Sequence, residues 1–244
     1  MRSRIIKKTL DDLPVAPNWV DSVQAREHFS WAAQMCGLSG LPGGGLNLAY
    51  EAVDRHALGD AGPHTALRIL DRNGGHRDVS YAELSVLTNR FANVLKSLGV
   101  TPGARVFVLC GRGLELFLGV LGAMKAGCVV SPLFCAFGPQ PLETRLCLGE
   151  ACVLLTSDAL YRRKISTIRD RLPTLKHVLV YNENAEDVAP LEGALNLHQL
   201  LAEADDHFSI ARTTADSPAL LHFTSGTTGT PKGVLHVHGA ALTH

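Results

Sequence analysis

Short apolar runs alternate with helix-period patterns along residues 80–237, and this alternation constrains the fold more than any other feature of the sequence. The clearest helix begins at Ser80 and Glu83, a pair typical of a capping box, and ends at Gly99. Its apolar residues recur at helical spacing: Leu84, Leu87, Phe91, Leu95 and Leu98. The strand-like runs are almost continuously apolar, as expected of a parallel sheet covered on both faces. We therefore predict an α/β fold with a mostly parallel sheet covered by helices.

The same patterns predict the individual elements. Strands are expected over residues 65–70, 105–110, 128–131, 152–156, 177–180, 219–223 and 234–237. Further helices are expected over residues 48–55, 114–126 and 197–204, and from Asp158 toward residue 170. Within residues 114–128, Glu115 and Lys125 are the only charges and are assigned to a solvated helix edge, and Arg112 to an exposed turn. Residues 1–45 lack sustained periodicity and are interpreted as a wrapping arm before a domain over residues 46–244.

The sequence TSGTTGTPKG, residues 224–233, combines glycines, hydroxyls and one lysine between two predicted strands. Glycines let successive N–H groups point into one concavity that suits anionic oxygens. We predict that the loop binds ATP phosphates through Thr224, Ser225, Gly226, Thr227, Thr228, Gly229, Thr230 and Lys232. Lys232 supplies a compact positive charge and is the candidate catalytic residue, because it would orient the phosphates. The alternative is an ordinary surface turn, since turns use the same residue types.

This loop differs from the P-loop of NTPases. There, glycine directly precedes the lysine and a hydroxyl directly follows it. Here Pro231 precedes Lys232 and Gly233 follows, so the hydroxyl that holds magnesium in a P-loop is missing. The loop also joins two strands, so we expect N–H groups and Lys232 to supply the electrostatics without a helix dipole.

Three segments resemble core motifs of the adenylate-forming (AMP-binding) superfamily, in that family's order. They are VSYAEL at residues 79–84, MKAGCVVSPL at 124–133 and TSGTTGTPKG at 224–233. Within the superfamily the likeness is strongest to acetyl-CoA synthetases, through residues 47–57, 131–139 and 222–238. The resemblance implies the first half of the superfamily's large N-terminal domain, with residues 46–244 as an incomplete AMP-binding domain and the C-terminal domain absent.

The resemblance also implies a two-step ligase reaction. A carboxylate attacks the α-phosphorus of ATP to give an acyl-adenylate, and the thiolate of CoA then takes the acyl group. ATP, Mg²⁺ and CoA are the implied cofactor and co-substrates, and acetate or another short carboxylate is the implied acid. The implied activity is that of an AMP-forming acetate–CoA ligase, an acid–thiol ligase. Small molecules are therefore the expected partners, without nucleic acid or membrane.

The family's acyl pocket, adenine-binding segment, magnesium-binding glutamate and catalytic lysine would all follow the phosphate loop, so none is assigned here. We accordingly expect the 244 residues alone to be inactive. Three hypotheses stay open: part of an acetate or short-chain acid CoA ligase, part of a relative that adenylates another acid, or a non-catalytic binding module.

Composition narrows the setting. Lysine plus arginine equals aspartate plus glutamate at 23 each, so no net charge favours nucleic acid or an anionic membrane. Charges interrupt the longest apolar region, so no membrane span is expected. Six cysteines without a CxxC pair favour buried, reduced thiols and a cytoplasmic location, while the basic start MRSRIIKK leaves a transit peptide open.

Histidines raise the question of a metal. Alternation along a strand would place His236 and His238 on one face, where His222 or His244 could complete a zinc site. No cysteine or carboxylate stands at ligand spacing, so we predict packed histidines and no metal site.

Overall fold

The computed structural model describes residues 8–17, 20–71, 74–182, 191–224 and 229–243. The chain divides into two compact units, Met1–Leu38 and Ser39–His244. In the first unit, the described residues form the 3₁₀ helix η1 (Leu10–Asp12) and the helices α1 (Ser22–Glu27) and α2 (Trp31–Met35). Asp21 and Ser30 cap α1 and α2 by accepting backbone N–H groups, and none of these short helices contains a buried residue.

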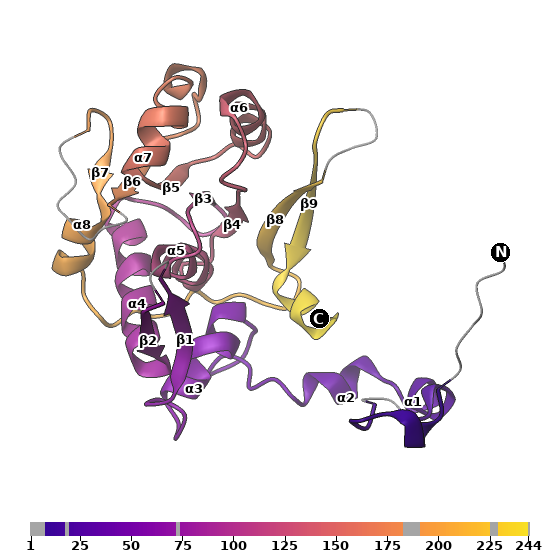
Figure 1. Cartoon of the computed structure of the whole chain (residues 1–244). Coiled ribbons are helices and arrows are strands. Elements are labelled where there is room, and N and C mark those ends of the chain that lie inside the picture. Colours follow the sequence, from indigo (N-terminus) through magenta and orange to yellow (C-terminus); the bar gives the residue numbers. More distant parts are fainter. Residues whose placement is uncertain (1–7, 18–19, 72–73, 183–190, 225–228, 244) are drawn as a thin grey trace. The chain divides into compact units, whose positions relative to one another are not determined.

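Among the described residues, seven strands of the second unit form one sheet in the order β7-β6-β5-β3-β4-β8-β9 (Figure 1). They are β3 (Arg105–Leu109), β4 (Val129–Pro132), β5 (Val153–Ser157), β6 (His177–Tyr181), β7 (Leu195–Asn196), β8 (Pro218–Thr224) and β9 (Lys232–Val237). All neighbours are parallel except β8 and β9, which form an antiparallel hairpin. A separate antiparallel pair joins β1 (Thr65–Leu70) to β2 (His76–Ser80). The predicted mostly parallel α/β sheet is confirmed.

Helices cover both faces of this sheet, and alternation along β3 shows how. Val106 and Val108 pack in the cluster that contains α4 (Tyr81–Ser97), α5 (Leu114–Lys125) and α8 (Leu197–Glu203). Phe107 and Leu109 face the other cluster, which contains α6 (Pro139–Leu148) and the segment after β5. Figure 1 shows α6 and α7 (Asp158–Leu160) on the opposite side of the sheet from α4. Both faces of β3 are therefore apolar, which explains its continuous hydrophobic run.

Two predicted helix starts differ in detail. Ser80 caps α4 by accepting the N–H of Glu83, but the Glu83 carboxylate pairs with Arg77 at 2.8 Å, so only half of the predicted capping box forms. At the next predicted start, Ser157 and not Asp158 is the cap of α7. The helical path then continues through the π-helix η3 (Tyr161–Ile165) and the 3₁₀ helix η4 (Arg169–Arg171).

The prediction that Lys125 lies on a solvated helix edge is wrong, because its side chain is fully buried. Its ammonium donates to Asp54 Oδ1 and Asn89 Oδ1, both at 2.7 Å, and to the Ser85 carbonyl at 3.2 Å. Asp54 ends the π-helix η2 (Tyr50–Asp54), directly before α3 (Arg55–Ala57), so the ion pair ties this segment to α4 and α5. Burial lowers the pKa of Lys125, and the negative charge of Asp54 opposes that shift.

The cysteines are free, but burial is not uniform. Cys110 and Cys128 are buried, as predicted, whereas Cys36 and Cys147 are exposed. Burial, with a smaller contribution from Cys152, raises the pKa of Cys128 to about 12, so that thiol stays protonated.

Within the described ranges, none of the helices combines the length and the apolar character that crossing a bilayer requires.

Candidate phosphate-binding site

The β8–β9 hairpin presents the glycine- and threonine-rich loop. Its last registered pair is Thr224 with Lys232, preceded by Phe223 with Gly233. Residues directly opposite in an antiparallel pair point to the same face, so the hydroxyl and the ammonium project from one side of the loop's base. Both side chains are exposed. The sequence prediction that this loop joins two strands is confirmed.

Only part of the loop lies within the described residues. Ser225, Gly226, Thr227 and Thr228 lie outside them, so the structure does not test their predicted contacts with phosphate. Gly229 adopts a φ of +83°, in the left-handed region that favours glycine. Among the described residues, no atom lies within 4 Å of where its Cβ would be, so in that part of the chain it is the backbone conformation that favours glycine.

A cavity of about 290 Å³ lies between the loop and the start of α6. Gly229 and Pro231 line it on one side, and Gln140, Thr144 and Arg145 are among its lining residues on the other. The Arg145 guanidinium lies 4.2 Å from the ring centroid of Phe137 and donates to the Pro141 carbonyl at 2.9 Å. Its Nε is buried without a hydrogen-bond partner among the described residues. A second cation and the first turn of a helix therefore lie beside the loop, and our sequence analysis identified neither.

Buried polar contacts hold the other end of the hairpin. His238, which follows β9, accepts the Leu48 N–H at Nδ1 over 3.1 Å and is fully buried. Burial lowers the pKa of His238 to about 4, so its imidazole is neutral at pH 7. Asn47, also fully buried, donates to the Met124 carbonyl at 2.8 Å and to Thr213 Oγ1 at 3.1 Å. These bonds connect the residues before β8 and after β9 to the segment that begins η2.

Two other predicted positions are plainly placed. Arg112 follows β3 and is exposed, as expected of a turn. Glu115 is partly buried on α5, with Oε1 3.6 Å from His198 Nε2. Neither residue lines the cavity beside the loop.

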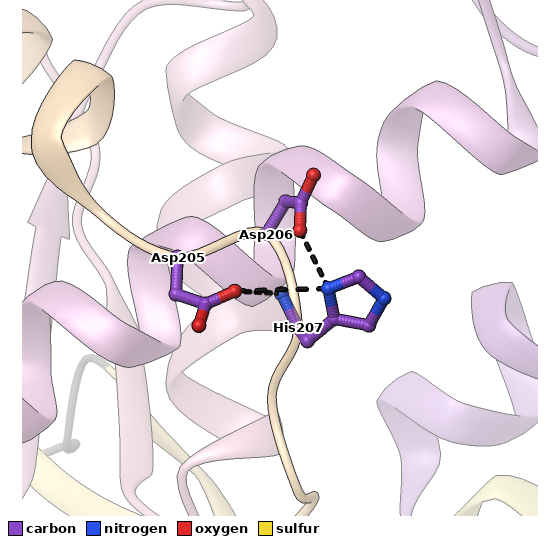
Figure 2. Close-up of side chains that lie close together, drawn as sticks. All are labelled: Asp205, Asp206 and His207. Carbon is purple, nitrogen blue, oxygen red and sulfur yellow. Dashed lines mark hydrogen bonds and ion pairs between the residues drawn. The ribbon is translucent and has the colours of Figure 1, made fainter.

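The predicted pairing of histidines is wrong. His236 and His238 do not share an environment, because β9 ends at Val237 and His238 turns into the core. His222 and His236 come together instead, with ring centroids 5.8 Å apart. In the described part of the chain, three or more potential metal ligands gather only at Asp205, Asp206 and His207 (Figure 2). His207 Nδ1 lies 2.6 Å from Asp206 Oδ1 there, and the group is largely exposed.

Residues 53–244 match the family model described as AMP-binding enzyme. This match covers most of the chain, and the chain therefore belongs to the AMP-binding enzyme family. The family membership and fold inferred from the three sequence motifs are confirmed.

Among curated proteins, the chain is 38% identical over 218 residues to the acetyl-coenzyme A synthetase of Bacillus subtilis, covering 88% of this chain and 36% of that protein. It is 32% identical over 213 residues to the 3-hydroxypropionyl-coenzyme A synthetase of Metallosphaera sedula, covering 82% of this chain and 32% of that protein. The chain thus spans about a third of the length of these relatives.

Solved structures agree with this assignment. An acyl-CoA synthetase of Brucella canis superposes with a TM-score of 0.80 at 26% identity, over 91% of this chain and 39% of that one. An anthranilate CoA ligase in complex with anthranoyl-AMP superposes with a TM-score of 0.70 at 25% identity, over 86% of this chain and 36% of that one.

Proposed function

We propose that the chain supplies the ATP-phosphate-binding part of a ligase that activates acetate or another short carboxylic acid as an acyl-adenylate and transfers it to CoA. The observation that carries this proposal is the pairing of Thr224 with Lys232 at the base of the loop. It places a hydroxyl donor and a cation on one side of the only segment in the sequence with this density of glycine and threonine. The names of the relatives support the reaction class, and two of them support a short acid.

In this proposal the loop binds the β- and γ-phosphates of ATP and orients the pyrophosphate that leaves. The substrate carboxylate is the nucleophile, and its oxygen forms a bond to the α-phosphorus as the bond to the bridging oxygen of pyrophosphate breaks. Negative charge grows on the pyrophosphate during this step, so Lys232 and the hydroxyl of Thr224 would stabilise the transition state more than the ground state. Thr230 and the N–H groups of the glycines would complete the set of donors.

The loop's donors fit phosphate but not a metal. Residues 224–233 contain no carboxylate, so Mg²⁺ would be held by phosphate oxygens or by side chains outside the loop. CoA would accept the acyl group in the second step. We further propose that residues 46–244 belong to the AMP-binding domain, with residues 1–45 as a preceding arm.

Two alternatives stay open, and one of them has specific support. A different acid is favoured by the likeness to a ligase solved with anthranoyl-AMP, since the acyl pocket is not among the sites assigned here. A non-catalytic module would keep the phosphate loop for binding only. Acid-dependent pyrophosphate exchange distinguishes both ligase hypotheses from the non-catalytic module, which would show none.

The test is Lys232→Ala in the protein that carries this chain. A charge-assisted hydrogen bond contributes about 1.5 to 3 kcal/mol, so acid-dependent pyrophosphate exchange should fall about 10- to 100-fold. The melting temperature should change little, because Lys232 is exposed. Lys176→Ala, at another exposed lysine, is the matched control and should leave exchange unchanged. Unchanged exchange in Lys232→Ala, with a lower melting temperature, would show that the lysine is structural.

A further inference from the structure

His222 and His236 form a pair that the phosphate site does not use. In the hairpin register Leu220 lies opposite His236 and Val234 opposite His222, so the two histidines are diagonal neighbours on one face of the sheet. Their ring planes meet at 87° and their centroids are 5.8 Å apart. In the described ranges, neither imidazole has a hydrogen bond or ion pair, so their ring nitrogens are not committed to the fold.

We propose that His222 and His236 together bind a divalent transition-metal ion of the zinc class. Imidazole nitrogen suits such ions and binds zinc at about 2.0 to 2.1 Å. With about 1.1 Å from each nitrogen to its ring centroid and a tetrahedral angle, two ligating rings have centroids about 5.2 Å apart. The observed 5.8 Å therefore needs only a small side-chain rotation to reach ligating geometry.

The pair is open to solvent. His222 is exposed and His236 half-buried, so an ion can reach them from solvent. Two protein ligands would leave the other coordination positions to water or a small anion.

This site is separate from the phosphate-binding loop. On the same hairpin face, the pair Thr224–Lys232 lies two registered positions beyond His222, in the direction away from His236. A bound ion would bridge β8 and β9 and would stabilise the hairpin, because it would bind the folded pairing and not the separated strands.

The experiment is titration of the whole chain with Zn²⁺ alone, in which calorimetry measures binding and the melting temperature measures stabilisation. The exposed thiols Cys36 and Cys147 would also bind zinc, so both are first replaced by serine. We expect one equivalent to bind and raise the melting temperature. Each of His222→Ala and His236→Ala should weaken that binding by at least about tenfold, since even indirect support of a ligand contributes that much.

His207→Ala is the matched control, because His207 belongs to the other group of potential ligands in the described residues. It should leave the zinc equivalent unchanged. Far-UV circular dichroism checks that each variant is folded, and His222→Gln provides a second replacement that keeps a polar side chain. The proposal is overturned if no zinc binds, if the binding persists unchanged in folded His222→Ala and His236→Ala, or if His207→Ala is the variant that removes it.

Discussion

Lys125 offers the sharpest test of how this domain is held together. Its side chain is fully buried, and its ammonium donates hydrogen bonds to Asp54 and Asn89, both at 2.7 Å. Lys125→Met keeps the length of the side chain but removes the charge. Asp54, only 6% exposed, would then keep the Ser85 hydroxyl at 2.6 Å as its remaining side-chain partner among the described residues.

Removing one partner of a buried ion pair costs about 3 to 5 kcal/mol, because the other charge is left uncompensated. Folded domains are stable by about 5 to 15 kcal/mol in total, so this variant should lose a large fraction of its stability. Lys125→Met combined with Asp54→Asn removes the stranded charge as well. The double variant should therefore lose less free energy of unfolding than the two single variants lose in sum, by at least about 1 kcal/mol.

Urea unfolding followed by circular dichroism measures these differences at constant pH. Lys96→Met is the control, because Lys96 is exposed on the neighbouring helix α4 and its replacement should change stability by less than about 0.5 kcal/mol. A loss below about 1 kcal/mol for Lys125→Met, or strict additivity in the double variant, would refute the view that the pair is energetically coupled.

Two further predictions concern pH and substrate. The pKa of His238 is about 4 in the folded chain against 6.5 ordinarily, so the unfolded chain takes up the proton first. Stability should thus fall by about 2 to 3 kcal/mol as pH drops from about 6.5 to 4. The variant His238→Asn should remove that part of the pH dependence, because its amide oxygen can still accept the Leu48 N–H. Identical pH profiles of unfolding for the two proteins would contradict the assignment. In the protein that carries this chain, acetate or propionate should give acyl-CoA faster than benzoate or long fatty acids, and a tenfold preference for the latter would reject the short-acid proposal.

Local patterns predicted most of the sheet because each strand's character is set by its own residues. The runs at β3, β5 and β6 are almost continuously apolar because helices cover them on both sides, and their predicted bounds agree with the structure to within one residue. The sequence signal was weaker where an element has little apolar character. The helix α6 begins at Pro139 and carries few buried residues, and we did not predict it. The two-residue strand β7 is too short to show a period.

Residues that act through distant partners were harder to predict. Lys125 was assigned to a solvated helix edge because a helix that covers a sheet still shows one face to water. Its partner Asp54 lies 71 positions earlier in the sequence. Arg145 lies beside the glycine- and threonine-rich loop because of how α6 packs, and sequence spacing does not reveal that packing. His222 and His236 meet through the register of the hairpin, whereas period-two spacing alone had paired His236 with His238.

The two ends of the hairpin are attached to the rest of the domain in different ways. Among the described residues, the registered pairing of β8 with the parallel sheet is limited to Leu220 opposite Val130 of β4. Farther toward the loop, the hairpin is supported by side chains: Phe223 lies 6.2 Å from Phe107, measured between ring centroids. Buried hydrogen bonds through His238 and Asn47 hold the end of the hairpin that lies away from the loop, while Thr224 and Lys232 lie at the exposed end. Phosphate would therefore bind where the hairpin has the least support from the sheet, so contacts with substrate would contribute directly to the order of that end.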